Sequence, residues 1–445
     1  MGSKLQRLAT AMPLYLGIAV LCLPANAQPG GPNVGSESPV EGVSFRFIES
    51  NGLRMRIAEA GEGPLILLAH GWPESWYSWR HQMTMLANSG YHVVAPDMRG
   101  YGETDKPADV DDYDIVHLAG DMVGVLDALG EETAIMVGHD WGSIVAWNAV
   151  LLHPQRFSAL IAMSVPYGGR ARQSPMVGWK AAFGDNFYYI LYHNEPGGVA
   201  EAEYDANPRG LLSRLYLSPS SPREAPLVTD PLRSAGGWID RLGEPKGMPG
   251  WLEADDLDYV ISMFEKSGFR GGINYYRNFQ RNWEITDNLD GVKVQMPTLF
   301  IAGARDVVIA GATQEQLTGS MSRATEDLRG VVLIPGIGHW VQQEAPEATN
   351  AAMLEFLQGL WRSAHYPLTM IFFTGSRCRI SFCDPGAAQD TGESIIPFVA
   401  GLLKDRAATA AIKLLYMCQQ NWTIIQWYDA GVVHSFGMDQ GIVLG

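Results

Sequence analysis

Cysteine is scarce in this sequence of 445 residues: there are four, and none lies between Cys22 and Cys378. A disulfide framework therefore cannot hold the long central part of the chain together, which must rely on a hydrophobic core. The remaining cysteines, Cys383 and Cys418, lie with Cys378 near the C-terminus, at a spacing that fits neither a zinc site nor a paired scaffold. The sequence predicts no metal site and no cofactor.

Positive charge is also scarce, with 32 Lys and Arg against 48 Asp and Glu and a formal net charge of -16 at pH 7. A nucleic-acid binder needs clustered basic residues that displace counterions from phosphates, and the sequence has no such run. Hydrophobic residues make up 47% of the chain, which is enough for a large core. We therefore expect an acidic globular protein without a nucleic-acid partner; its oligomeric state is open.

Long hydrophobic runs are lacking too, apart from a short one at the N-terminus. Basic residues precede an apolar stretch over residues 8–23, and Ala25–Ala27 supplies small residues for cleavage. A membrane-spanning helix needs about 20 apolar residues, whereas this stretch is shorter and contains Pro13. We interpret residues 1–27 as a signal peptide and expect a periplasmic or secreted protein without stable membrane insertion. An uncleaved anchor is the alternative.

Short apolar runs alternate with helical segments over much of the chain. Such alternation predicts a mostly parallel sheet with helices on both faces. Predicted strands cover residues 44–48, 53–58, 65–69, 92–95, 134–137, 160–163, 298–302 and 331–334. Predicted helices cover residues 116–129, 143–152 and 346–361.

This alternation stops after the sixth strand, where residues 167–288 are rich in Tyr, Trp, Pro and Gly. We interpret them as a helical cap, which typically forms an apolar binding pocket over a sheet. The predicted organisation is a signal peptide (1–27), a flexible linker (28–42), a core in two parts (43–166 and 289–363) around the cap (167–288), and a tail of unknown role (364–445). Within the tail, residues 408–417 are compatible with a helix, and the whole tail with an added domain or a non-native extension.

The segment Gly138–Gly142 follows the strand over 134–137 and precedes a helix, the context of a nucleophile elbow. Flanking glycines permit a tight turn that lifts the central side chain above the sheet. In the common pattern the central residue is serine, and here it is Asp140. An aspartate at this place could instead cap the following helix.

An aspartate nucleophile restricts the chemistry. Its pKa near 3.9 leaves it ionised at neutral pH, so that it attacks without an activating base. Attack on a carboxylic ester would give a reactive anhydride, whereas attack on a saturated carbon gives an ester that water can cleave. The electrophile is therefore expected to be an epoxide or a carbon–halogen bond.

The residues predicted to hydrolyse the ester intermediate follow other strands. His339 follows the last strand and is the predicted base that activates water, and Asp306 follows the preceding strand and would orient it. The order nucleophile, acid, histidine is typical of α/β-hydrolases. The backbone amides of Trp72, in a His-Gly-Trp-Pro loop after an early strand, and of Trp141 are predicted to form the oxyanion hole.

Three segments together resemble epoxide hydrolases of the soluble type: residues 70–80, 97–103 and 138–142. The resemblance extends over about residues 43–363 and implies an α/β-hydrolase fold with a helical cap. It also implies two cap tyrosines that donate hydrogen bonds to the epoxide oxygen, and Tyr189 and Tyr276 stand at the matching places, next to Tyr188, Tyr192 and Tyr275. Trp141 and Trp340 are predicted to line the substrate pocket.

Two other functions remain open. A haloalkane dehalogenase shares the aspartate nucleophile, but such enzymes usually carry asparagine where Trp72 stands, and a departing halide has no use for paired tyrosines. A non-catalytic exported binding protein is the second alternative, which the intact set of Asp140, His339 and Asp306 disfavours. The sequence therefore predicts an epoxide hydrolase that uses water to form vicinal diols through a covalent ester, without a cofactor.

Overall fold

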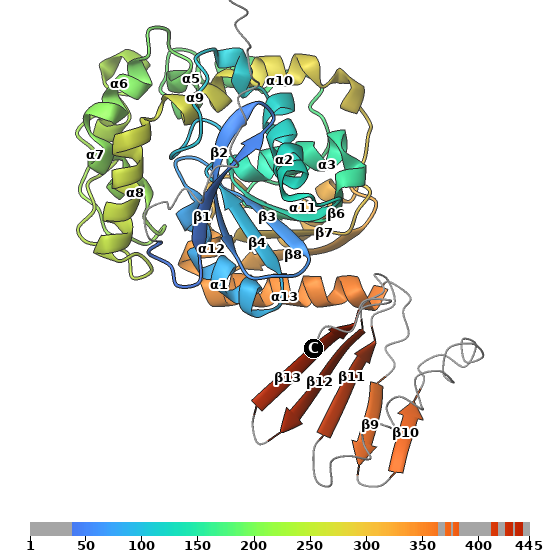
Figure 1. Ribbon diagram of the computed structural model, residues 1–445. Helices are drawn as coiled ribbons and strands as arrows, with labels where there is room; N and C mark the ends of the chain where they lie inside the picture. Colours follow the sequence, from blue (N-terminus) through green and yellow to red (C-terminus); the bar gives the residue numbers. More distant parts are fainter. Residues whose placement is uncertain are drawn as a thin grey trace, which may run out of the picture.

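The computed structural model describes residues 38–363 and five strands in the tail. An eight-stranded sheet forms the centre, in the order β1-β2-β4-β3-β5-β6-β7-β8 (Figure 1). Its strands are β1 (Ser44–Ser50), β2 (Leu53–Ala60), β3 (Leu65–Ala69), β4 (His92–Pro96), β5 (Ala134–His139), β6 (Phe157–Met163), β7 (Thr298–Gly303) and β8 (Leu328–Ile334). Strand β2 pairs antiparallel with β1 and β4, and all other pairs are parallel. All eight predicted strands and the mostly parallel sheet are confirmed.

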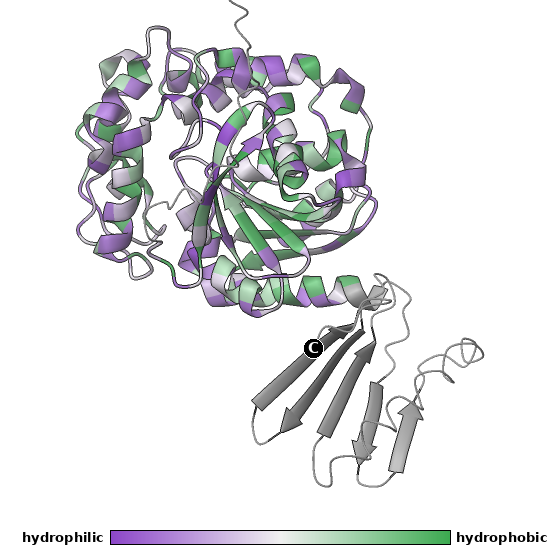
Figure 2. Cartoon of the chain, viewed as in Figure 1, coloured by the Kyte–Doolittle hydropathy of each residue, from purple (hydrophilic) through white to green (hydrophobic). Residues whose placement is uncertain are grey.

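Helices cover both faces of the sheet, with α2 and α3 on one face and α1 and α13 on the other (Figure 1). The helices of this core are α1 (Arg80–Asn88), α2 (Ile115–Leu129), α3 (Trp141–Leu152), α11 (Gln314–Met321), α12 (Val341–Glu344) and α13 (Pro346–Ser363). Short 3-10 turns η1 (Trp76–Trp79), η2 (Val110–Tyr113), η3 (Pro154–Arg156) and η6 (Asp287–Leu289) connect them and the cap. Because the sheet is covered on both sides, all residues of β3, β5 and β7 are buried, and the central sheet is mostly hydrophobic (Figure 2).

Helix α2 shows why the predicted helices form where they do. The side chain of Asp114 accepts hydrogen bonds from the amides of Val116 and His117, which satisfies two unpaired donors at the helix start. Gly130 then ends the helix in the left-handed conformation that favours glycine. The predicted helix over 116–129 is confirmed with its start moved by one residue.

The segment between β6 and β7 forms a helical cap on one side of the core (Figure 1). Its helices are α4 (Pro175–Phe183), α5 (Tyr189–His193), α6 (Val199–Ala206), α7 (Pro208–Leu215), α8 (Ala254–Ser267), α9 (Arg270–Arg277) and α10 (Phe279–Ile285), with 3-10 turns η4 (Arg233–Ala235) and η5 (Ile239–Arg241) in the long connection between α7 and α8. The insertion of a helical cap after the sixth strand is as the sequence predicts.

The tail contributes a separate antiparallel sheet in the order β10-β9-β11-β12-β13. Its strands are β9 (Met370–Thr374), β10 (Arg377–Ser381), β11 (Ala411–Tyr416), β12 (Thr423–Asp429) and β13 (Val432–Met438). The helix considered for residues 408–417 is wrong: strand β11 occupies this run and pairs with β9 and β12. A short apolar run does not reveal by its periodicity whether it is helix or strand.

The signal peptide predicted over residues 1–27 lies outside the described residues. Among the helices that are described, none has the length and apolar character required to cross a bilayer.

Candidate active site

Asp140 stands at a sharp bend between β5 and α3. Its backbone has φ +52° and ψ -118°, an uncommon conformation for a residue other than glycine. The bend brings the backbone so close that a β-carbon at Gly142 would lie 2.0 Å from the carbonyl oxygen of Ala69. The carboxylate forms no cap hydrogen bond with α3, although Asp140 occupies the N-cap position. The helix-cap interpretation therefore does not account for this aspartate.

The two oxygens of the Asp140 carboxylate have different surroundings. Oδ1 accepts a hydrogen bond from the backbone amide of Trp72 at 2.8 Å, and the backbone amide of Trp141 also acts to lower the pKa of the carboxylate. Oδ2 lies 3.7 Å from Nε2 of His339. The structure thus brings the two amides predicted for an oxyanion hole to the same carboxylate, and leaves the other oxygen beside the imidazole.

His339 lies in the loop between β8 and α12, and Asp306 follows β7. Nδ1 of His339 is 3.1 and 3.2 Å from the two carboxylate oxygens of Asp306. Ser164, after β6, donates a hydrogen bond from Oγ to Oδ2 of Asp306 at 2.6 Å and lies 3.0 Å from Nδ1 of His339. Ser164 was not predicted from the sequence; its backbone φ of +70° is a structural sign that its position is constrained.

The charges of this group act on one another. Burial alone would lower the pKa of His339, but the charge and hydrogen bond of Asp306, together with the charge of Asp140, outweigh it and raise the pKa to about 9. Burial raises the pKa of Asp140 above its ordinary value, although His339 and the backbone amides oppose the shift. Near neutral pH the arrangement therefore favours an imidazolium between two carboxylates.

A fully buried carboxylate, Glu74, joins three loops of the site. It accepts hydrogen bonds from the amide of Gly71 at 2.7 Å and from Gln342 at 2.8 Å, and it contacts Nδ1 of His139 at 2.8 Å. Nε2 of His139 lies 2.8 Å from the carbonyl oxygen of His339. Burial opposes ionisation, but the contacts with His139 dominate and lower the pKa of Glu74 to about 2.

Each nitrogen of the His139 ring therefore lies within hydrogen-bond distance of an oxygen from another loop. These contacts link the Trp72 loop, the elbow and the His339 loop. The sequence does not predict this role, because His139 and Glu74 stand inside motifs in which neighbouring residues carry the catalytic pattern. Buried charged residues at the ends of strands were the available signal.

The rings of Tyr189 on α5 and Tyr276 on α9 lie in edge-to-face contact within the cap. Their ring centroids are 5.8 Å apart with an interplanar angle of 78°. Burial, then neighbouring tyrosines and the charge of Asp140, raise the pKa of both hydroxyls well above the ordinary value. Both phenols therefore keep their protons and are suited to donate hydrogen bonds.

The neighbouring tyrosines are engaged elsewhere. The hydroxyl of Tyr192 donates to Glu203 at 2.8 Å, and that of Tyr275 donates to the carbonyl oxygen of Arg99 at 2.9 Å. The ring of Tyr188 stacks on Phe183 with centroids 4.2 Å apart. These contacts favour Tyr189 and Tyr276, on whose hydroxyls the charge of Asp140 acts, over their neighbours as hydrogen-bond donors to a ligand.

The two predicted pocket tryptophans lie in different surroundings. The ring of Trp141 contacts Tyr276 at 5.1 Å between centroids, edge to face. The ring of Trp340 stacks on Tyr216 at 4.6 Å, and its indole N–H donates to the carbonyl oxygen of Leu215 at 2.9 Å. Trp340 thus anchors the end of cap helix α7 to the core beside His339, and its contact with substrate stays a prediction.

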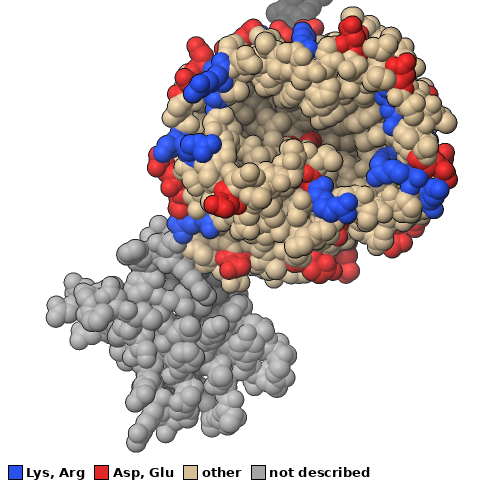
Figure 3. Space-filling view, turned by 180° about the vertical axis from the view of Figure 1, so that it is seen from behind, with Lys and Arg blue, Asp and Glu red and all other residues tan. Residues whose placement is uncertain are grey.

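The site remains reachable from outside. The side chains of Asp140 and His339 are 13% and 18% exposed, whereas that of Asp306 is fully buried. Seen from behind, the molecule is deeply hollowed, and the walls of the hollow are mostly uncharged (Figure 3). Such walls suit an apolar substrate.

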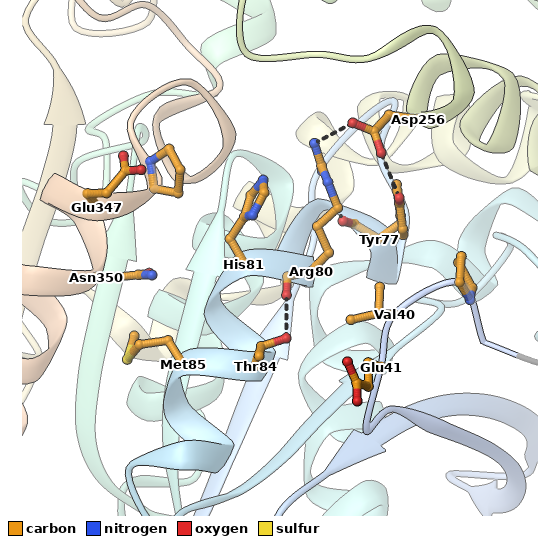
Figure 4. A pocket seen from close by; sticks show the side chains of 12 residues that line it. Val40, Glu41, Tyr77, Arg80, His81, Thr84, Met85, Asp256, Glu347 and Asn350 are labelled. Carbon is orange, nitrogen blue, oxygen red and sulfur yellow. Dashed lines mark hydrogen bonds and ion pairs between the residues drawn. The ribbon is translucent and has the colours of Figure 1, made fainter.

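A different pocket, of about 600 Å³, lies among α1, α13 and the start of the described chain (Figure 4). Arg80 reaches Asp256 across it at 3.3 Å, and Tyr77 donates to the same carboxylate at 2.6 Å. None of Asp140, His339 and Asp306 lines it.

Comparisons with known proteins agree with this geometry. Residues 64–346 match the family model described as alpha/beta hydrolase fold. "Epoxide hydrolase A" of Mycobacterium tuberculosis is 46% identical over 321 residues, which are 71% of this chain and 97% of that protein. "Epoxide hydrolase 1" of Siraitia grosvenorii is 37% identical over 72% of this chain and 99% of that protein. The crystal structure of Epoxide Hydrolase A from Mycobacterium thermoresistibile has 45% identity, a TM-score of 0.65 and coverage of 71% of this chain and 98% of that one.

Proposed function

The chain belongs to the epoxide hydrolases of the α/β-hydrolase fold, and from this premise we propose that it converts epoxides to vicinal diols through an ester on Asp140. The observation that carries the mechanism is the unequal environment of the carboxylate. Oδ1 is held by the Trp72 amide at 2.8 Å, while Oδ2 faces His339 at 3.7 Å and makes no helix cap.

In the first step, Oδ2 of Asp140 attacks an epoxide carbon and the carbon–oxygen bond of the ring breaks. The departing oxygen takes a proton from the hydroxyl of Tyr189 or Tyr276, because an alkoxide is a poor leaving group without a donor. Oδ1 becomes the carbonyl oxygen of the ester and keeps the Trp72 hydrogen bond. A departing halide needs no proton, so a dehalogenase would not require such a pair of donors. The comparisons also do not favour a dehalogenase or a binding protein.

In the second step, water attacks the carbonyl carbon of the ester and gives a proton to Nε2 of His339. The charge that develops on Oδ1 is stabilised by the amides of Trp72 and Trp141. Collapse releases Oδ2 with the diol, and the proton on His339 passes to that oxygen. The acid re-formed at Asp140 then ionises, and its proton replaces the one that the tyrosine gave up.

Ester formation prepares His339 for this role. In the free enzyme the charge of Asp140 is among the causes that raise the pKa of His339 to about 9. The ester is neutral, so this contribution disappears and the pKa falls. The imidazole therefore becomes a base after the nucleophile has reacted.

His339→Gln is expected to trap the ester, because Asp140 can still open the ring while water lacks its base. Intact-protein mass spectrometry should show a gain equal to the mass of the whole epoxide, and Asp140→Asn should show none. In one turnover of unmodified enzyme in ¹⁸O-water, the label should enter Asp140 and not the diol. A diol that carries the label in that turnover would exclude the ester.

We further propose that the protein is exported, on the basis of the apolar stretch and small residues in 1–27. Expression of the full chain with cell fractionation should give a periplasmic or secreted product that begins after Ala27. A product that retains Met1 in the cytoplasmic fraction would refute export.

A further inference from the structure

Trp238 lies in the long cap connection between α7 and α8, and its indole stacks on two other rings. The ring of Tyr189 lies 4.8 Å away between centroids, with 16° between the planes. The ring of Trp72 lies 5.8 Å away, with 9° between the planes. The indole of Trp238 therefore packs against the proposed donor Tyr189 and against the loop whose backbone amide binds Asp140.

The connection that carries Trp238 is fastened to the cap helices by the carboxylate of Glu203 on α6. This carboxylate accepts the backbone amides of Trp238 and Ile239 at 3.0 and 2.9 Å. It also accepts the hydroxyl of Tyr192 at 2.8 Å, and Tyr192 belongs to α5, the helix that begins with Tyr189. One carboxylate therefore fixes the indole relative to the helix of the proposed proton donor.

The residue before Trp238 allows this close approach. A β-carbon at Gly237 would lie 2.2 Å from Oε1 of Glu203, so any larger residue would displace the carboxylate or the connection. The sequence thus provides a glycine, an indole and a carboxylate that depend on one another, in a part of the cap where regular secondary structure is limited to short 3-10 turns.

We propose that Trp238 is a positioning residue for Tyr189: it holds the phenol ring so that its hydroxyl reaches the epoxide oxygen during ring opening. The proposal rests on the proposed function of Tyr189 as a donor. A donor acts only within hydrogen-bond distance of the reacting oxygen, and a displacement of about 1 Å is enough to cost up to about 100-fold in rate. Parallel stacking restrains the phenol plane, which hydrogen bonds of the hydroxyl alone do not.

The test measures ester formation and ester hydrolysis separately, by rapid quench and mass spectrometry on the full chain. Trp238→Leu is expected to slow ester formation on the order of tenfold, while the hydrolysis rate and the dissociation constant of the epoxide stay as they are. Trp238→Phe keeps a stacking ring and should restore most of the rate. Trp251→Leu is the matched control, since Trp251 lies in the same connection but contacts Tyr216 with tilted rings, 6.3 Å apart between centroids, and donates to Ser218.

Repeating the Trp238 substitution in the Tyr189→Phe variant distinguishes loss of positioning from a general disturbance of the cap. In Tyr189→Phe, no hydroxyl remains to be placed, so adding Trp238→Leu should slow ester formation no further. A further tenfold loss in that background, an equal loss in Trp251→Leu, or an unchanged rate in Trp238→Leu would each overturn the proposal. If Tyr189→Phe alone is as fast as the unmodified enzyme, the donor role of Tyr189 has failed, and if Asp140→Asn still forms diol, the ester mechanism has failed.

Discussion

On the core side of the site, Asp140, Asp306 and His339 follow strands β5, β7 and β8, and hydrogen bonds from backbone and buried charges fix each of them. On the cap side, Tyr189 and Tyr276 lie on helices and are surrounded by aromatic rings. Hydrogen bonds have preferred distances and directions, whereas ring contacts tolerate a range of arrangements. Directional hydrogen bonds therefore hold the Asp140 carboxylate, whereas packing against neighbouring rings holds the two phenols.

The strongest way to break the core side is to remove Glu74, which is fully buried. Glu74→Ala would leave the ring of His139, the amide of Gly71 and the amide of Gln342 without their partner. Leaving these buried groups unpaired costs about 3 kcal/mol or more in total, so denaturant unfolding should show a fall of that size in the free energy of unfolding, with loss of both chemical steps.

Glu103→Ala is the matched control for this change. Glu103 is 52% exposed and lies 3.6 Å from Arg56. Because this carboxylate is exposed to solvent, its contact contributes about 0.5 kcal/mol. Equal destabilisation by the two substitutions would contradict the view that buried charges hold the core side.

On the cap side, removal of a phenol hydroxyl is expected to slow ester formation without lowering the free energy of unfolding. Tyr276→Phe and Tyr189→Phe keep their ring contacts and lose only the hydroxyl, so ester formation should slow by about 100-fold while ester hydrolysis and the free energy of unfolding stay nearly unchanged. Single-turnover kinetics would measure both steps.

Tyr275→Phe, next to Tyr276, is expected to have the opposite result: lower stability with an unchanged rate of ester formation. Its hydroxyl donates to the carbonyl oxygen of Arg99 at 2.9 Å in the buried core. Its loss should cost about 1 kcal/mol of stability and leave ester formation as fast as before. The comparison of the two sides would be wrong if Tyr275→Phe slowed ester formation as much as Tyr276→Phe does.

The core side could also be predicted from the sequence to a greater extent than the cap. Strands such as 65–69 are short apolar runs bounded by glycine and proline, and the order of Asp140, Asp306 and His339 follows from the positions after those strands. What escaped prediction there is the pairing of Glu74 with His139, which lie 65 residues apart and meet only because β3 and β5 are neighbours.

The cap offers no such regularity. Tyr189 and Tyr276 were assigned by resemblance, and Trp238 was missed, because its partners Tyr189 and Trp72 come from segments that the fold alone brings together. The tail shows the same limit in another form: residues 411–416 form a strand where the apolar run was compatible with a helix, since pairing with β9 and β12 decided the outcome.

The smallest expected effect is on the pH dependence of ester hydrolysis. Measuring it tests whether the charge of Asp140 influences the pKa of His339. Burial acts to lower the pKa of His339, but in the free enzyme Asp306, and to a smaller extent Asp140, raise it to about 9. Hydrolysis needs the neutral imidazole, so its rate should rise with pH through the pKa that His339 has in the ester. Because the ester lacks the Asp140 charge, that midpoint should lie below 9. Asp306→Asn should lower the midpoint further, because the carboxylate that raises the pKa most is then missing as well. Stopped-flow measurement of ester decay across pH gives both midpoints; a midpoint at or above 9 in the unmodified enzyme would mean that the nucleophile does not influence the base.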